Sequence, residues 1–460
     1  MSHNGTLDEH YQTVREFYDG KSVFITGATG FLGKAYVEKL AYSCPGIVSI
    51  YILIRDKKGS NTEERMRKYL DQPIFSRIKY EHPEYFKKII PISGDITAPK
   101  LGLCDEERNI LINEVSIVIH SAASVKLNDH LKFTLNTNVG GTMKVLELVK
   151  EMKNLAMFVY VSTAYSNTSQ RILEEKLYPQ SLNLNEIQKF AEEHYILGKD
   201  NDEMIKFIGN HPNTYAYTKA LAENLVAEEH GEIPTIIIRP SIITASAEEP
   251  VRGFVDSWSG ATAMAAFALK GWNNIMYSTG EENIDLIPLD YVVNLTLVAI
   301  AKYKPTKEVT VYHVTTSDLN PISIRRIFIK LSEFASKNPT SNAAPFAATT
   351  LLTKQKPLIK LVTFLMQTTP AFLADLWMKT QRKEAKFVKQ HNLVVRSRDQ
   401  LEFFTSQSWL LRCERARVLS AALSDSDRAV FRCDPSTIDW DQYLPIYFEG
   451  INKHLFKNKL

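Results

Sequence analysis

Residues 22–33 read SVFITGATGFLG, and this stretch decides the fold. Its first five residues form a short apolar run typical of a buried strand, and three glycines spaced three residues apart follow directly. The first glycine permits a tight turn, the second lets the backbone approach a pyrophosphate, and the third allows a helix to pack closely on the strand. The helix that begins there offers N–H groups and a positive dipole end to phosphate. The stretch therefore predicts a dinucleotide site whose candidate contacts are Thr26, Gly27, Thr29, Gly30, Phe31, Leu32 and Gly33.

Five more β-branched runs of strand length follow in the first two-thirds of the chain. They are nearly continuously apolar, which is typical of parallel strands covered on both faces. Stretches of helix length, such as 31–42 and 141–152, alternate with them. This alternation predicts an α/β fold with a doubly wound parallel sheet of the Rossmann type. The six predicted strands are 22–26, 48–54, 89–93, 115–120, 157–162 and 235–239.

The pattern changes from about residue 305 onward. Residues 338–353 are uncharged and rich in Ala, Thr, Ser and Pro, which is typical of a linker or lid, and the residues beyond them are helical in pattern. The domains that we expect are an N-terminal extension over 1–20, a Rossmann domain over 21–335, a linker or lid over 336–355 and a helical C-terminal domain over 356–460.

Composition excludes several classes of protein. The 460 residues carry 55 Lys and Arg against 52 Asp and Glu, and a net charge of +3 argues against a nucleic-acid binder. The four cysteines are dispersed, which predicts a reducing compartment and no metal site. The polar N-terminus is no signal peptide. Because a membrane span needs about 18 or more apolar residues, the shorter stretch 361–374, which contains Pro370, predicts no transmembrane segment.

The ends of the second, third and fourth strands bear on which dinucleotide binds. Arg55 stands where NAD enzymes place an acidic residue, and a guanidinium suits the 2′-phosphate of NADP, so we expect NADPH. Asp56 leaves NAD open as the alternative. Asp95 and Ile96 follow the third strand, where the carboxylate either reaches the adenine amino group or makes a plain turn. The small residues around Ala122 let a cofactor lie against backbone.

A tyrosine and a lysine predict the chemistry. Tyr215 and Lys219 are four residues apart, which puts both side chains on one face of a helix. An ammonium beside a phenol favours the phenolate and lowers the pKa of Tyr215, so the tyrosine can pass a proton to an oxygen that gains charge during hydride transfer. Ser162 and Thr163, at the end of the fifth strand, offer a hydroxyl to the same oxygen. Tyr217 points to another face, and we expect it to be packing.

These motifs together resemble the extended short-chain dehydrogenase/reductase family, and further stretches sharpen the resemblance to fatty acyl-CoA reductases, above all the insect, moth pheromone-gland type. The match extends through the whole chain. The stretches that carry it are TGATGFLGK (26–34), GDIT (94–97), HSAAS (120–124), NVGGT (138–142), VSTAYSN (161–167), YTKALAE (217–223), IRPSII (238–243) and IDWDQY (438–443).

The resemblance implies an alcohol-forming enzyme that reduces long-chain fatty acyl-CoA to a primary alcohol through a bound aldehyde, with two NADPH, and releases CoA. It implies lipid or pheromone biosynthesis at the cytosolic side of the endoplasmic reticulum. Thr163 or Ser162 would act in catalysis with Tyr215 and Lys219, and Asn138 and Lys219 would join the cofactor contacts. Many members end in a membrane-spanning tail, which this sequence does not contain, so we expect any membrane association to be peripheral.

Three stretches bear on the substrate, and each has a plainer alternative. The insert 166–212 predicts a helical cap over the substrate entrance or a structural excursion. The apolar stretches 260–272 and 361–377 are candidate walls of an acyl tunnel, although residues at helical spacing more often belong to a core. The basic run 379–389 suits the phosphates of CoA, an anionic membrane surface or a solvated helix face.

Two other functions share part of this pattern. A sterol or sugar-nucleotide dehydrogenase or epimerase would have the glycines and the Tyr–Lys pair, but it would not explain the helical region over 356–460. A non-catalytic NADPH-binding protein would have the fold without needing Tyr215 and Lys219. A Tyr215→Phe variant discriminates between these functions.

Overall fold

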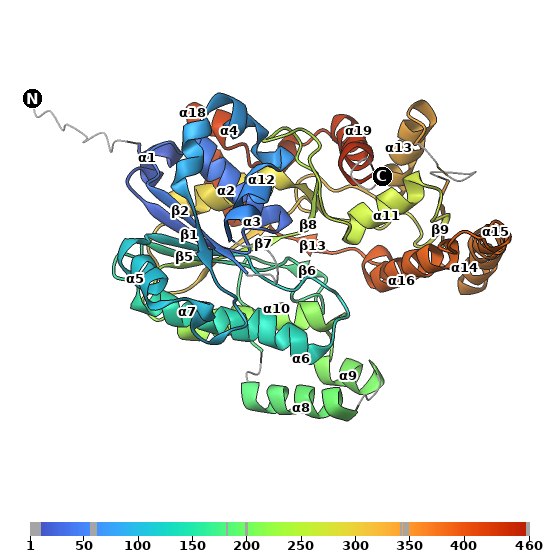
Figure 1. Ribbon diagram of the computed structural model, residues 1–460, viewed down its shortest axis with the longest axis horizontal. Coiled ribbons are helices and arrows are strands. Elements are labelled where there is room, and N and C mark those ends of the chain that lie inside the picture. Colours follow the sequence, from blue (N-terminus) through green and yellow to red (C-terminus); the bar gives the residue numbers. More distant parts are fainter. Residues whose placement is uncertain are drawn as a thin grey trace, which may run out of the picture.

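A seven-stranded parallel sheet forms the centre of the computed structural model, which describes residues 11–55, 62–180, 183–197, 201–340, 343 and 349–456 (Figure 1). The spatial order of the strands is β11-β7-β5-β4-β1-β2-β3. The predicted doubly wound α/β fold is confirmed. The strands are β1 (Ser22–Thr26), β2 (Ser49–Ile54), β3 (Ile89–Ser93), β4 (Ile117–His120), β5 (Met157–Val161), β7 (Thr235–Pro240) and β11 (Thr310–Val314).

Helices cover both faces of the sheet because successive strand residues point to opposite sides. In β1, Val23 and Ile25 belong to the apolar cluster that contains α2 and α12, whereas Phe24 belongs to the cluster that contains α5, α7 and α10. Figure 1 shows these two layers above and below the strands. The helices are α1 (Val14–Tyr18), α2 (Phe31–Ser43), α3 (Thr62–Leu70), α4 (Ser76–Glu81), α5 (Asp105–Glu114), α7 (Gly141–Glu151), α10 (Thr214–Glu229) and α12 (Leu289–Ala301).

Strand order reverses beside β1, where the chain passes to β2 on one side and β4 lies on the other. In open α/β sheets, ligands bind in the crevice at the carboxyl ends of the strands at such a point. The strand that sequence reasoning missed is β11, which lies at the sheet edge and pairs only with β7. The predicted bounds of β2, β4, β5 and β7 differ from the observed ones by one or two residues at one end.

The insert between β5 and α10 contains two helices, α8 (Leu184–Leu197) and α9 (Asn201–Ile208). The His194 ring bonds Glu203 at 2.8 Å and so joins these helices. Lys132 of α6 (Leu131–Thr134) forms a 2.7 Å ion pair with Glu192 of α8. The insert therefore packs beside the loop that follows β4, and Figure 1 shows it at the lower edge of the molecule.

The C-terminal region is helical and has two parts. Residues 356–405 form an arm that projects at the right of Figure 1, and residues 414–456 pack back against the sheet domain. Tyr447 and Phe448 share one apolar cluster with Val23 and Ile25 of β1. The arm contains α14 (Lys356–Thr363), a π-helical turn (Phe364–Thr368), α15 (Thr369–Thr380) and α16 (Phe387–Thr405). The second part contains α17 (Glu414–Ala421), α18 (Asp425–Val430) and α19 (Trp440–Gly450). Two helices that precede the C-terminal region, α11 (Gly260–Leu269) and α13 (Ile324–Lys337), lie beside these parts.

Three short parallel strand pairs hold distant segments together. β8 (Ile242–Thr244) pairs with β10 (Leu286–Pro288). The others are β9 (Ile275–Tyr277) with β12 (Leu351–Thr353), and β6 (Ile172–Leu173) with β13 (Leu410–Leu411). Part of the expected linker, residues 341–342 and 344–348, lies outside the described residues, and residues 351–353 near its end form β12.

The helix that contains the apolar stretch around residues 361–374 is longer than the sequence pattern predicts. The apolar stretch around residues 361–374 belongs to a continuous helix over Lys356–Thr380, 25 residues long, which is long and apolar enough to cross a membrane. Counting uninterrupted apolar residues missed it because Pro370 does not end the helix. Pro370 lies at the first turn of α15, directly after a π-helical turn, where a proline is tolerated.

Candidate active site

The glycine turn forms the floor of the crevice. Gly27 has φ +73°, and a Cβ there would lie 2.7 Å from the backbone nitrogen of Ala122. A Cβ on Gly33 would lie 2.7 Å from the Cα of Ala28, so both positions require glycine. Gly30 is the N-cap of α2 and has no side chain to occupy the first N–H groups of that helix. The turn therefore leaves a cradle of backbone donors that fits a pyrophosphate.

A buried histidine fixes the side chain of Thr26 at the edge of this cradle. The Nδ1 atom of His120 lies 2.7 Å from the Thr26 hydroxyl, and its Nε2 atom lies 3.0 Å from the Thr142 hydroxyl. Burial, and to a lesser extent the charge of Lys219, lower the pKa of His120 to about 3. The ring is therefore neutral at physiological pH. The Thr26 hydroxyl also accepts a 3.3 Å hydrogen bond from the Ala122 N–H.

Asn138 joins the loop after β4 to the helix that carries Tyr215. Its amide oxygen accepts a 2.8 Å hydrogen bond from the Ser124 N–H. Its amide nitrogen donates to the Ser124 carbonyl at 3.2 Å and to the Thr218 hydroxyl at 3.0 Å. The side-chain polar atoms of Asn138 are thus engaged within the protein, and they link this loop to α10.

Arg55 and Asp95, the candidate contacts for the adenosine half of the cofactor, follow the neighbouring strands β2 and β3. The Gly94 N–H donates a 3.1 Å hydrogen bond to the Ile54 carbonyl, which brings the two strand ends together. Arg55 is exposed there. One carboxylate oxygen of Asp95 accepts 2.8 Å bonds from the N–H and hydroxyl of Thr97. Ile96 is buried, and Asp56 lies outside the described residues.

Helix α10 carries Tyr215 and Lys219 and is capped by the Asn213 side chain, which accepts a 2.8 Å hydrogen bond from the Ala216 N–H. The Lys219 ammonium donates to the Val161 carbonyl at 2.6 Å, immediately before the Ser162–Thr163 pair. The Thr163 hydroxyl lies close enough to the phenol of Tyr215 to lower its pKa. Strand β5 and helix α10 therefore converge on one point.

The titration of this group differs from the sequence expectation. Burial raises the pKa of Tyr215 to about 12, and the hydrogen bond with Thr163 opposes that rise only in part. Burial also lowers the pKa of Lys219 to about 7, against the favourable charge of Glu223. The expected lowering of the Tyr215 pKa by Lys219 is not found, because burial is the largest influence on this phenol and Thr163, not Lys219, opposes it.

The remaining residues near this point have different environments. The Ser162 hydroxyl is buried and has no hydrogen-bond partner in the described part of the chain. Tyr217 is buried against the rings of Phe207 and His211, which confirms its expected packing role.

Sequence reasoning missed a buried ion pair beneath the site. Glu223 binds Arg239 through two bonds of 2.8 and 2.7 Å, and both side chains are at most 2% exposed. The Ser166 hydroxyl donates to the same carboxylate at 3.2 Å. Glu223 lies one helical turn after Lys219, and this four-residue spacing is the signal that could have found it.

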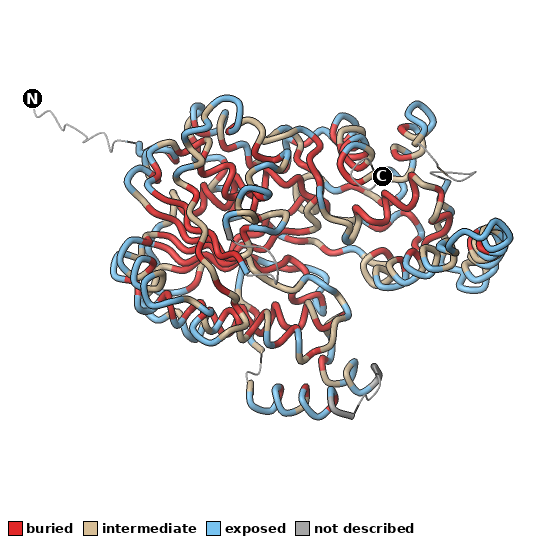
Figure 2. Tube along the Cα trace, in the orientation of Figure 1, coloured by how far each residue is buried: buried red, intermediate tan, exposed pale blue. Residues whose placement is uncertain are grey.

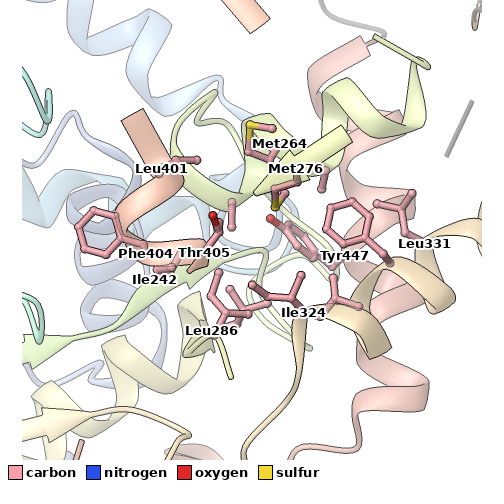
Figure 3. Close-up of a pocket in the computed structure, with 15 residues that line it drawn as sticks. Ile242, Met264, Met276, Leu286, Ile324, Leu331, Leu401, Phe404, Thr405 and Tyr447 are labelled. Atoms are coloured by element: carbon pink, nitrogen blue, oxygen red, sulfur yellow. The ribbon is translucent and has the colours of Figure 1, made fainter. Parts of the chain in front are cut away.

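An apolar cavity of about 60 Å³ lies between strand β8 and helices α11, α13 and α16 (Figure 3). The Tyr165 ring, two residues after Thr163, packs on Phe404 with 5.3 Å between centroids, and Phe404 lines the cavity. The lining residues come from several elements and include Ile242, Met264, Met276, Leu286, Leu331, Leu401 and Tyr447. The Tyr165 ring thus connects the Ser162–Thr163 loop to the wall of the cavity.

Only one of the two apolar stretches that were expected to line an acyl tunnel lines the cavity. Stretch 260–272 contributes Ala261, Met264 and Ala265 to the cavity. Stretch 361–377 contributes none of the lining residues, and most of its large side chains are exposed. It is therefore neither a wall of this cavity nor core.

Comparison with known proteins agrees with this geometry. Two family models described as male sterility protein match residues 25–296 and 366–458, and the first is a model of an NAD-binding domain. The chain is 33% identical to fatty acyl-CoA reductase 1 of Homo sapiens over 451 residues, which is 97% of this chain and 87% of that protein. Fatty acyl-CoA reductase 2 of Bos taurus is also 33% identical, with the same shares covered. The chain belongs to the fatty acyl-CoA reductase family.

Solved structures of other proteins share the fold. The terminal R domain from the myxalamid PKS-NRPS biosynthetic pathway has a TM-score of 0.64 at 17% identity, with 95% of this chain and 92% of that chain covered. The UDP-glucuronic acid 4-epimerase from Bacillus cereus in complex with NAD has a TM-score of 0.53 at 15% identity, covering 95% and 98%. The family and the glycine cradle identify an NAD(P)-dependent oxidoreductase with a nicotinamide cofactor. The relation to the insect pheromone-gland type stays a prediction.

Proposed function

We propose that this protein is an alcohol-forming fatty acyl-CoA reductase. It reduces a long-chain acyl-CoA, with two NADPH and two protons per thioester, to a primary alcohol and free CoA, and it holds the intermediate aldehyde. The observation that carries the proposal is the convergence of Tyr215, Lys219 and Thr163 beside the glycine cradle, with an apolar cavity behind Tyr165.

The protein's own residues handle the substrate oxygen and the protons. The bound nicotinamide supplies hydride, once to the thioester and once to the aldehyde. The phenol of Tyr215 is protonated at neutral pH because its pKa is raised to about 12, so it can donate to the carbonyl oxygen together with the Thr163 hydroxyl. The first tetrahedral species expels the CoA thiolate. In the second reduction Tyr215 protonates the alkoxide, and Lys219, with a pKa of about 7, returns a proton to the tyrosine.

The acyl chain occupies the apolar cavity in this proposal, and α8 and α9 of the insert cap the entrance. Met264 and Ala265 of α11 line the cavity. Their side chains would set the chain length that fits. The cavity must widen for a long chain, which requires α16, the helix that carries Leu401 and Phe404, to shift. We place the enzyme in lipid or pheromone biosynthesis, attached peripherally to the cytosolic face of the endoplasmic reticulum.

Arg55 supports the choice of NADPH over NADH. A guanidinium gives charge-assisted hydrogen bonds to a 2′-phosphate, each of about 1.5–3 kcal/mol. We expect Arg55→Ala to raise the KM for NADPH by about 10-fold or more and to change the KM for NADH by less than about 2-fold. Initial rates with each cofactor measure this. Equal losses with both cofactors would contradict the 2′-phosphate role.

The decisive experiment measures NADPH oxidation by the purified protein with palmitoyl-CoA, and mass spectrometry identifies the products. We expect hexadecanol at two NADPH per thioester. Aldehyde alone would limit the reaction to one hydride transfer. NADPH binding without turnover of any acyl-CoA would overturn the proposal and favour a sterol or sugar-nucleotide dehydrogenase.

A pair of tyrosine variants on one helix tests the site. Tyr215→Phe removes the proton donor, and we expect kcat to fall by about 10²- to 10⁴-fold. Tyr217→Phe is the matched control, because Tyr217 packs two residues away on another face, and its kcat should stay within about 2-fold. Retained activity in Tyr215→Phe would exclude catalysis by this tyrosine.

A further inference from the structure

The arm, residues 356–405, carries a continuous apolar face that the rest of the described chain does not cover. Its large side chains recur at three- and four-residue spacing along α14, the π-helical turn and α15, which places them on one side. Figure 2 shows the arm as an exposed part of the molecule. Each of these side chains is 42–61% exposed. They are Leu361, Phe364, Leu365, Met366, Phe372, Leu373, Leu376 and Trp377, and we call them the apolar face of the arm.

The opposite side of the same helix is polar and engaged with α16. The Thr363 hydroxyl accepts a 2.8 Å hydrogen bond from Arg398, and the Thr368 hydroxyl lies 3.0 Å from the His391 ring. The Asp375 carboxylate accepts three bonds of 2.8–2.9 Å from the backbone N–H groups of residues 386–388, at the start of α16. These contacts fix which side of the helix faces outward.

The contacts with α16 also decide between lying on a membrane and spanning it. The helix over Lys356–Thr380 is long enough to span. A span would draw the Asp375 carboxylate, and Arg398 which bonds Thr363, into hydrocarbon, where charged groups are costly. With the polar side held by α16, only the apolar face can enter lipid, which is the geometry of an interfacial helix.

A cluster of cations borders the apolar face. Between residues 376 and 398 the only acidic residue is Glu384. An anionic lipid surface attracts each nearby Lys or Arg by about 1 kcal/mol. The same charges oppose face-to-face pairing of two copies, because the cationic clusters would then meet. The bordering basic residues are Lys379, Arg382, Lys383, Lys386 and Lys389, and all five are exposed.

We propose that the apolar face of the arm is a monotopic membrane-docking surface for an anionic phospholipid bilayer. The apolar side chains enter the boundary between headgroups and acyl chains, and the basic cluster binds headgroup phosphates. The helix α16 carries Leu401 and Phe404 in the wall of the apolar cavity, so docking brings that cavity beside the bilayer (Figure 3). The link to acyl-CoA entry rests on the proposed function; the docking surface itself does not.

Vesicle sedimentation with the full-length protein tests the surface. We expect binding to phosphatidylcholine vesicles that contain phosphatidylserine, and weaker binding as salt rises. The double variant Leu373→Glu/Leu376→Glu should weaken binding by about 100-fold or more, because it removes two inserted apolar side chains. Val418→Glu is the matched control, since Val418 is 61% exposed on α17, away from the arm, and it should bind as the wild type does.

Charge-reversal variants test the role of the basic cluster in lipid binding. Lys379→Glu/Lys383→Glu should remove the preference for phosphatidylserine and lower affinity by about 10-fold or more. Lys304→Glu/Lys307→Glu changes the net charge equally at an exposed loop elsewhere, and it should leave that preference intact. Equal effects of both double variants would overturn the role of the cluster.

Trp377 reports the depth of insertion. The other four tryptophans are buried or half-buried, so quenching by brominated lipids that depends on Trp377, and disappears in Trp377→Phe, locates the arm. Quenching strongest near the headgroups supports docking, and quenching strongest at the bilayer midplane would show a span and overturn it. No vesicle binding by folded protein, or a dimer that dissociates in Leu373→Glu/Leu376→Glu, would also overturn it. Sedimentation requires no turnover, so its failure and that of the proposed reaction are separable.

Discussion

The two apolar stretches 260–272 and 361–377 are similar in composition, but the first is buried and the second is largely exposed. Helix α11 in the first is buried between other helices, and Leu269 is fully buried. In the second, Leu373 is 56% exposed on the arm. The two helices differ in their packing partners. Helices α13 and α16 pack against α11, and Tyr447 of α19 hydrogen-bonds Thr262 of α11. Composition therefore identifies apolar helices here, but partners decide whether they form a wall or a surface.

The largest expected effect contrasts two leucine truncations. Leu269→Ala should lower the free energy of unfolding by about 2–5 kcal/mol, because it leaves a cavity in a packed core. Leu373→Ala should change it by no more than about 0.5 kcal/mol, because its side chain is largely in water in both states. Urea denaturation measures both variants. Similar losses would show that the arm packs against something in the isolated protein and would break the comparison.

A smaller effect concerns substrate choice. Ala265→Leu narrows the cavity, and we expect kcat/KM for palmitoyl-CoA to fall by about 10- to 200-fold relative to a shorter acyl-CoA, the range for one misfitted methylene. Leu365→Ala on the arm should leave that ratio unchanged in detergent-free solution without vesicles. Because added volume in a core also costs stability, thermal denaturation of Ala265→Leu serves as the control. An unchanged ratio would exclude this cavity as the acyl site.

The smallest effect is a pH dependence that only the buried region should show. Burial lowers the pKa of Lys219 to about 7, so between pH 7 and about 10 the unfolded chain holds a proton that the folded chain has lost. The free energy of unfolding should then rise with pH across this window, by no more than about 1.4 kcal/mol per unit. Lys219→Met should remove that slope. Lys379→Met, on the exposed arm, should keep the wild-type slope, and identical profiles for both variants would contradict the buried lysine.

Local sequence patterns predicted the parts of the fold that depend on local physics. The glycine turn, six of the seven sheet strands and the Tyr–Lys helix follow from spacing and apolar runs. The edge strand β11 was missed because its sequence, TVYHV, carries polar residues and lies where the alternation fades. His313 within it is buried against Arg239, 3.2 Å away, and no local pattern signals such a partner.

The sequence predicted which candidate residues lie close together, but it did not predict their pKa values correctly. Tyr215, Lys219 and Thr163 converge as their strand and helix positions suggest. The sequence predicted a lowered pKa for Tyr215, whereas burial raises it, and burial is a property of the assembled fold that no local pattern reports. The Glu223–Arg239 pair joins residues of a helix and a strand whose contact exists only after folding.

Two contacts between distant parts of the chain affect how it folds during synthesis. Strand β13 pairs with β6, and helix α19 shares one apolar core with β1. A ribosome delivers the glycine turn hundreds of residues before the segment that completes the cluster around it. Until that segment emerges, apolar surface on the helix layer of α2 and α12 stays open to water, and exposed surface of this kind promotes aggregation. The Rossmann domain should therefore depend on chaperones while the rest of the chain is still being synthesised. A fragment that ends at residue 335 should be insoluble, even though it contains Tyr215, Lys219 and Thr163.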